Sequence, residues 1–143
     1  MNLIKKIAVL SLSVIALNAY AMNEKQASEM LPITITSIDA PVQSRFITIL
    51  KINYEIENKG DKDIDAIKAA IVIQNPDGAV FKSLNVNTVS IKANTKVNDT
   101  FGYDFDENKF DDKKLQKLGT RLKAWLRVEE IIYSDGSYVN ISK

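Results

Sequence analysis

Apolar and polar residues alternate along most of the chain after Pro32, and this period-two pattern predicts β-strands. The longest run covers 46–57, and its odd positions become polar after Ile49. Its even positions are expected to face a core: Phe46, Thr48, Leu50, Ile52, Tyr54 and Ile56. Shorter runs predict further strands over 33–39, 67–73, 79–84, 86–91, 97–105, 122–133 and 138–141.

Turn residues separate these runs and predict how they pair. Asn75-Pro76-Asp77-Gly78 ends one run sharply, and 79–84 is expected to return as its hairpin partner. Ser134-Asp135-Gly136-Ser137 lies between two apolar runs, where Asp-Gly is the strongest short hairpin signal. Seven or eight strands spaced by about 8 to 12 residues predict a single all-β domain over 32–143, an antiparallel β-sandwich.

Residues 111–118 interrupt the alternation and predict one short helix. Asp111 or Asp112 is expected to cap its start and Gly119 to close its end. A helix running through Gly119 is the competing prediction, because Leu115, Leu118, Leu122 and Trp125 have helical spacing. The Asp-Gly hairpin that follows favours a strand over 122–128 instead.

The first 21 residues have the order of a secretory signal peptide. Two lysines and no acid precede an apolar run, and Ala19-Tyr20-Ala21 offers the small residues that a signal peptidase recognises. The run is about half the ~20 residues that a spanning helix needs. We expect cleavage after Ala21 and a periplasmic or secreted protein with no transmembrane segment. Residues 22–31 are expected to be a flexible, polar lead-in, either a disordered tail or one short helical turn.

Composition narrows the chemistry available to the chain. It holds no cysteine and no histidine, which excludes disulfides, lipid attachment to cysteine, Ser-His-Asp and Cys-His catalysis, and an ordinary zinc site. Removing residues 1–21 leaves 17 basic and 18 acidic side chains, a net charge of −1. This balance argues against a nucleic-acid partner, whose binding needs concentrated basic charge.

Several segments resemble small immunoglobulin-like domains of unknown function in bacterial envelope proteins, the FxLYD type among them. One segment is 52–64, in which a strand is followed by Asn58, then Lys59-Gly60-Asp61, then Ile64. The others are the turn over 75–78, residues 89–96, and Trp125 followed by 131–136. The resemblance covers roughly 46–138. It implies an immunoglobulin-like β-sandwich and carries over no catalytic residue.

Carboxylates in the segment 104–112 are the candidate metal site. Crowded carboxylate oxygens suit Ca²⁺, and the candidate ligands are Asp104, Asp106, Asp111 and Asp112. The segment is not an EF-hand, because Lys109 stands where glycine is needed and Leu115 where a bidentate glutamate is needed. A solvated loop that leads into a helix cap is the competing interpretation, and the favoured one.

Trp125 is the candidate ligand-binding residue, together with Arg121 and Arg127. On a strand, Trp125 shares its side with these basic residues and with Lys123, and could bind a sugar ring or an anionic ligand. The competing prediction, which we favour, places Trp125 in the core of the second sheet, where immunoglobulin-like domains often hold a tryptophan.

These features predict an exported, non-catalytic binding or scaffolding module of the bacterial cell envelope, monomeric or weakly oligomeric and without a cofactor. An envelope protein is the expected partner, paired along a sheet edge. The alternative is a hydrolase or inhibitor acting on envelope polysaccharide through paired carboxylates. Glu129 and Glu130 face opposite sides of a strand and cannot form the pair by themselves, so a partner from another strand is needed, such as Glu55 or Glu57.

Overall fold

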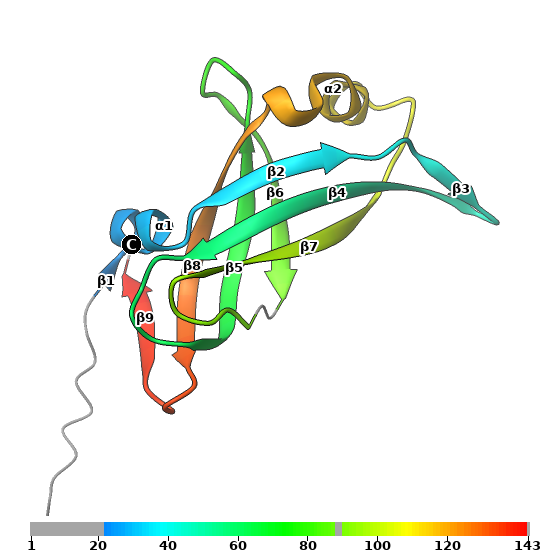
Figure 1. Ribbon diagram of the computed structural model, residues 1–143. Helices are drawn as coiled ribbons and strands as arrows, with labels where there is room; N and C mark the ends of the chain where they lie inside the picture. Colours follow the sequence, from blue (N-terminus) through cyan, green and yellow to red (C-terminus); the bar gives the residue numbers. More distant parts are fainter. Residues whose placement is uncertain (1–21, 88–89, 143) are drawn as a thin grey trace, which may run out of the picture.

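Two β-sheets packed face to face form the body of the protein (Figure 1). The computed structural model describes residues 22–87 and 90–142, so the predicted signal peptide lies outside the described residues. The first sheet has the order β1-β9-β8-β5-β6. Its strands are β1 (Met22–Asn23), β5 (Ile64–Gln74), β6 (Val80–Asn87), β8 (Lys123–Tyr133) and β9 (Tyr138–Ser142).

The second sheet is built around one long strand, β4 (Ile47–Asn58). Strand β7 (Thr95–Asp104) pairs along one side of β4. The other side of β4 pairs first with β3 (Val42–Ser44) and further along with β2 (Ile33–Ile38). Because every other residue of β4 from Leu50 to Ile56 faces the first sheet, this part of the strand supplies one wall of the core.

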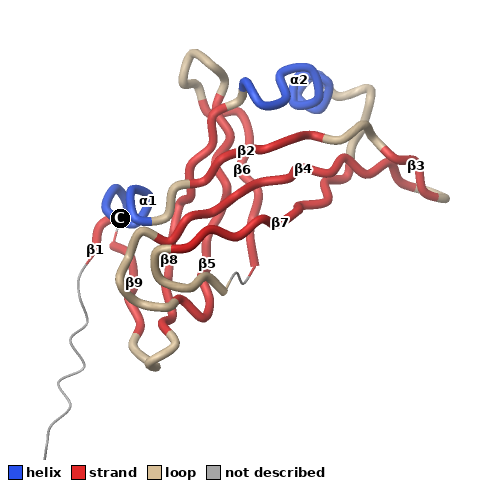
Figure 2. The backbone as a smooth tube through the Cα atoms, in the orientation of Figure 1, coloured by secondary structure: helices blue, strands red, loops and turns tan. Residues whose placement is uncertain are grey.

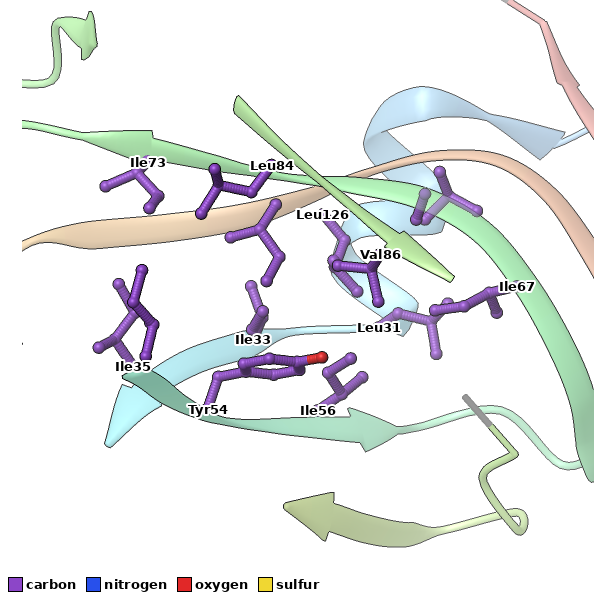
Figure 3. Close-up of a cluster of buried hydrophobic side chains, with 14 of the residues drawn as sticks. Leu31, Ile33, Ile35, Tyr54, Ile56, Ile67, Ile73, Leu84, Val86 and Leu126 are labelled. Atoms are coloured by element: carbon purple, nitrogen blue, oxygen red, sulfur yellow. The ribbon is translucent and has the colours of Figure 1, made fainter. Parts of the chain in front are cut away.

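Aliphatic side chains fill the space between the sheets, as Figure 3 shows. Each sheet contributes alternate residues, which is the packing expected of two half-buried sheets. The buried residues of β4 and β5 include Leu50, Ile52, Tyr54, Ile56, Ile67, Ala69, Ile71 and Ile73. Ala27 and Leu31 close the layer beside α1 (Glu24–Met30), and Leu115 does so from α2 (Phe110–Leu118).

The short helix predicted over 111–118 is confirmed as α2, but the expected cap at Asp111 or Asp112 is wrong, because the helix begins at Phe110 and its N-cap is Lys109, which makes no side-chain cap hydrogen bond. The helix ends at Gly119, which has a positive φ of 53° that residues with a Cβ rarely adopt. A 3₁₀ turn, η1 (Gly119–Arg121), then leads into β8. The competing helix through Gly119 to Trp125 is therefore wrong, and the β-rich, two-sheet prediction is confirmed.

The polar lead-in over 22–31, expected as a disordered tail or one short helical turn, contains the helix α1. Asn23 caps α1, since its side chain accepts a hydrogen bond from the Gln26 N–H at 2.9 Å and its N–H donates to the Gln26 side chain at 3.0 Å. Ala27 of the helix and Leu31 after it are fully buried. No helix among the described residues is long and apolar enough to cross a membrane.

Asn58 is a fully buried polar residue at the end of β4. Its amide NH₂ donates to the carbonyls of Lys62 at 2.9 Å and Ile91 at 3.1 Å, and its amide oxygen accepts from the Gly60 N–H at 2.9 Å. Ile91 in turn pairs with Ile64 at the start of β5. One side chain thus fixes the passage of the chain from the second sheet to the first.

Replacing this residue, Asn58→Ala, is expected to lower the free energy of unfolding by about 3 kcal/mol, because one buried and two partly buried backbone groups lose their partner. Urea unfolding followed by circular dichroism measures the change. Asn98→Ala on the exposed part of β7 is the matched control and should cost less than about 0.5 kcal/mol. Equal losses in both variants would contradict the role given to Asn58.

Candidate functional site

The hairpin of β3 and β4 projects beyond the sandwich as an arm (Figure 1). The arm, defined as residues 41–48, carries apolar side chains in solvent: Phe46 is 95% exposed, Val42 59% and Ile47 47%. The even positions of the run 46–57 were expected to face the core from Phe46 onward. That expectation is wrong for Phe46, because the buried part of β4 begins only at Leu50.

A hollow of about 930 Å³ lies between the arm and the segment that leads from β7 into α2. Figure 2 shows this loop running from the end of β7 to α2 at the margin of the sandwich. The arm contributes one wall through Pro41, Gln43, Phe46, Ile47 and Thr48. The opposite wall holds three carboxylates and two lysines: Asp104, Asp106, Glu107, Lys109 and Lys113.

The four candidate calcium ligands do not converge. Asp104 and Asp106 line the hollow, whereas Asp111 is exposed on α2 and Asp112 is fully buried. One oxygen of Asp106 already accepts from the N–H and the side-chain amide of Asn108, at 2.9 and 3.2 Å. In the part of the chain that the structure describes, no three acidic residues are placed to hold a metal ion together.

Asp112 forms an internal ion pair. Its Oδ1 accepts from Lys82 Nζ at 2.9 Å and from the Tyr103 hydroxyl at 2.8 Å, and its Oδ2 accepts from the Asp106 N–H at 2.8 Å. Lys82 also donates to the Tyr103 hydroxyl. Side chains from β6, β7 and α2 meet here, so the cluster fastens the helix to the edges of both sheets.

Burial alone would raise the pKa of Asp112, but its three hydrogen-bond donors outweigh burial and hold the pKa below its usual value. Burial would likewise lower the pKa of Lys82, yet its bonds to Tyr103 and Asp112 raise it. Our sequence analysis did not identify Lys82. The sequence does contain a signal for it, because Lys82 lies two residues before Leu84 and four before Val86, on the side of β6 that these buried residues share.

Trp125 lies outside the core, so the favoured expectation that it packs between the sheets is wrong. Its neighbours Leu126 and Val128 face inward, whereas Trp125 is half-buried on the outer face of β8, opposite Val72 of β5. Lys123 and Arg127 share that face by alternation. Arg121 does not, because its guanidinium donates to the carbonyls of Lys117 and Leu118 at the end of α2.

The carboxylates considered for polysaccharide hydrolysis lie in different sheets. Glu55 and Glu57 belong to β4, with Glu55 bound to Lys96 at 2.9 Å, whereas Glu129 and Glu130 belong to β8. Glu129 pairs with Lys68 at 3.0 Å. The side chains of Glu55 and Glu130 point away from the core on opposite faces of the sandwich, so the body of the molecule separates them.

No protein-family model matches the chain, and no curated protein is similar enough to count as a match. Among solved structures, the chain is similar to the X-ray structure of the Northeast Structural Genomics Consortium target SoR45. The TM-score is 0.41 and the sequence identity 11%, over 80% of this chain and 82% of that one. The geometry of the chain is therefore the basis on which its function is inferred.

Replacing the buried carboxylate, Asp112→Asn, is expected to lower the free energy of unfolding by about 3 kcal/mol, because Lys82 keeps its charge without a partner. The difference in free energy of unfolding between the two proteins should be complete above pH ~4. It should shrink as the pH falls through the lowered native pKa of Asp112, because the unchanged protein then loses the same ion pair. Urea unfolding at a series of pH values measures it.

The exposed neighbour provides the control for this prediction. Asp111→Asn should cost less than about 1 kcal/mol, the value of a charge in the first turn of a helix. A difference that stays constant down to pH 2 would show that Asp112 does not stabilise the fold as a carboxylate.

Calcium is expected to leave the stability of the protein unchanged, because the four candidate ligands are dispersed and Asp112 is occupied by Lys82. Thermal unfolding with excess Ca²⁺ and with a chelator should give the same midpoint. A midpoint several degrees higher in Ca²⁺ would restore the calcium site predicted from the sequence.

Proposed function

We propose that the protein is an exported, non-catalytic module of the bacterial cell envelope that binds another envelope protein through the arm. The exposure of Phe46 carries this proposal. Moving an exposed aromatic side chain from water into a partner's pocket lowers the free energy of the complex, and Phe46 lies at the tip of a projecting hairpin where a partner can reach it. Val42 and Ile47 extend the apolar surface beside it.

The free edge of β3 supplies the second part of the contact. β3 pairs only with β4, so its other edge presents unpaired backbone groups within the described chain. An extended segment of a partner can add to such an edge, with backbone hydrogen bonds giving affinity and side-chain pockets giving specificity. The other free edge of this sheet, β7, carries Lys96, Asp99 and Asp104, and such charges oppose strand addition.

The proposal extends to the fold, for which an immunoglobulin-like topology is the best description. Its support is the distribution of strands along the chain. β2, β4 and β7 correspond in order to strands A, B and E, and β5, β8 and β9 to strands C, F and G. In this correspondence β6 follows C and pairs with it, while β1 and β3 are additions at the edges.

The partner is expected to be captured by a photo-cross-linking amino acid placed at Gln43, which is exposed on β3. Cross-linking in the native envelope should give one abundant protein adduct, identified by mass spectrometry. The substitution Phe46→Ser should weaken capture at least about tenfold, because the aromatic anchor is lost. Thermal stability should not change, since the side chain is solvent-exposed in the free protein.

Two controls test whether capture of the partner depends on the arm. Phe110→Ser removes another exposed phenylalanine, 77% exposed and outside the arm, and should leave capture intact. The same cross-linker placed at Asn98 on the β7 edge should give no such adduct. Equal capture from both edges, or capture that survives Phe46→Ser, would contradict the proposal.

A further inference from the structure

A second surface, on the other sheet, has the composition of a binding site. On β8 the side chains of Lys123, Trp125 and Arg127 project from the outer face, at successive intervals of about 7 Å. Across β5, the register places Ser83 and Asn85 of β6 on the same face, in line with Trp125 and Arg127. We call these five residues the tryptophan face. The helices lie at the margins of the sandwich, where Ala27 and Leu115 pack into the layer between the sheets (Figure 2).

The side chains of the tryptophan face are held across the strands. The guanidinium of Arg127 donates to the Ser83 hydroxyl at 3.5 Å, so the arginine crosses β5 to reach β6. Ala70 and Val72 of β5 point outward beneath it and are only 4% and 2% exposed. Trp125 is the cross-strand neighbour of Val72 and Arg127 that of Ala70, so the face combines a buried apolar base with polar groups at its surface.

Among the described residues, no carboxylate forms an ion pair with Lys123 or Arg127 of this face. Lys82 and Lys96 elsewhere in the sheets each bind a carboxylate, and Lys68, which precedes Ala70 on the same outer face, is paired with Glu129. No cation stacks on the indole of Trp125 in the same part of the chain, where the two cation–π contacts involve Tyr103 and Tyr133. One aromatic ring therefore lies between two cations that form no ion pair within the described residues.

We propose that the tryptophan face binds an anionic polysaccharide, a chain of sugar rings that carry carboxylate or sulfate groups. The indole provides a flat apolar surface for the C–H face of one sugar. Lys123 and Arg127 on either side meet the acidic groups of the adjoining sugars, and Arg127 can bind a carboxylate with two parallel hydrogen bonds. Ser83 and Asn85 supply hydrogen-bonding groups for sugar hydroxyls.

The chain offers a direct probe, because Trp125 is its only tryptophan. Short alginate oligosaccharides, which carry one carboxylate on each sugar, are titrated into the chain beginning at Met22 while the tryptophan emission is recorded. The emission should shift or be quenched with a saturating dependence, and binding should weaken as salt is added. Neutral dextrin oligosaccharides of the same length should bind at least about tenfold more weakly, because the charge-assisted contacts are missing.

The substitutions Lys123→Gln and Arg127→Gln should each weaken alginate binding by about tenfold. Both side chains are exposed, so the folded state is retained, and an unchanged thermal midpoint verifies it. Lys51→Gln is the matched control, because Lys51 is an exposed lysine on the outer face of the second sheet, and it should bind alginate like the unchanged protein.

Three outcomes would overturn the proposal: no change in emission with alginate, equal weakening by Lys51→Gln, or equally tight binding of inorganic polyphosphate. The last would mean that charge alone is recognised and that the sugar ring is not. Tighter binding of single-stranded DNA than of alginate would identify a nucleic acid as the ligand class instead. None of these outcomes depends on the arm, which belongs to the other sheet.

Discussion

The aliphatic layer between the two sheets is the constraint on which the rest of the structure depends. A chain without cysteine has no covalent cross-link to limit its unfolded state, so its stability comes from burial of apolar surface. Isoleucine dominates this layer, and its β-branched side chain suits the pleated surface of a strand. Every strand that reaches the layer is fixed in register, because a slip of one residue would turn its apolar set to solvent.

Two polar clusters close the ends of this layer. Asn58 lies at the end of β4, where the chain leaves the second sheet, and the Lys82–Asp112 pair lies near the other end, beside α2. Both fasten loops or helices that the apolar layer alone would not hold. A buried polar group without a partner costs free energy, so each cluster also specifies one arrangement of its segment and disfavours others.

Much of the fold could be predicted from local pattern. The period of two identified the long strands, and Asp135-Gly136 identified the last hairpin, because both signals reside in neighbouring residues. Alternation gives the two faces of a strand but not the length of its partners. For this reason Phe46 was assigned to the core, although β4 reaches the core only at Leu50, and Trp125 was assigned to the wrong face of its sheet.

The candidate sites depended on contacts between distant segments, and these were the least predictable. Lys82 and Asp112 are separated by 30 positions and meet only because the fold brings β6 and α2 within reach of each other's side chains. The acidic residues of 104–112 do not converge for a related reason. The helix that begins at Phe110 buries Asp112 and leaves Asp111 exposed to solvent. Residues 22–31 were interpreted by their polarity. The burial of only two of them, Ala27 and Leu31, attaches this segment to the core.

The pairing of β1 with β9 joins strands from opposite ends of the described chain (Figure 1). Closing so long a loop costs entropy that is recovered only once the final strand is in place. A polypeptide that is synthesised from its amino end therefore cannot complete the five-stranded sheet until β9 has followed. The topology itself delays closure of the fold until the final strand is available.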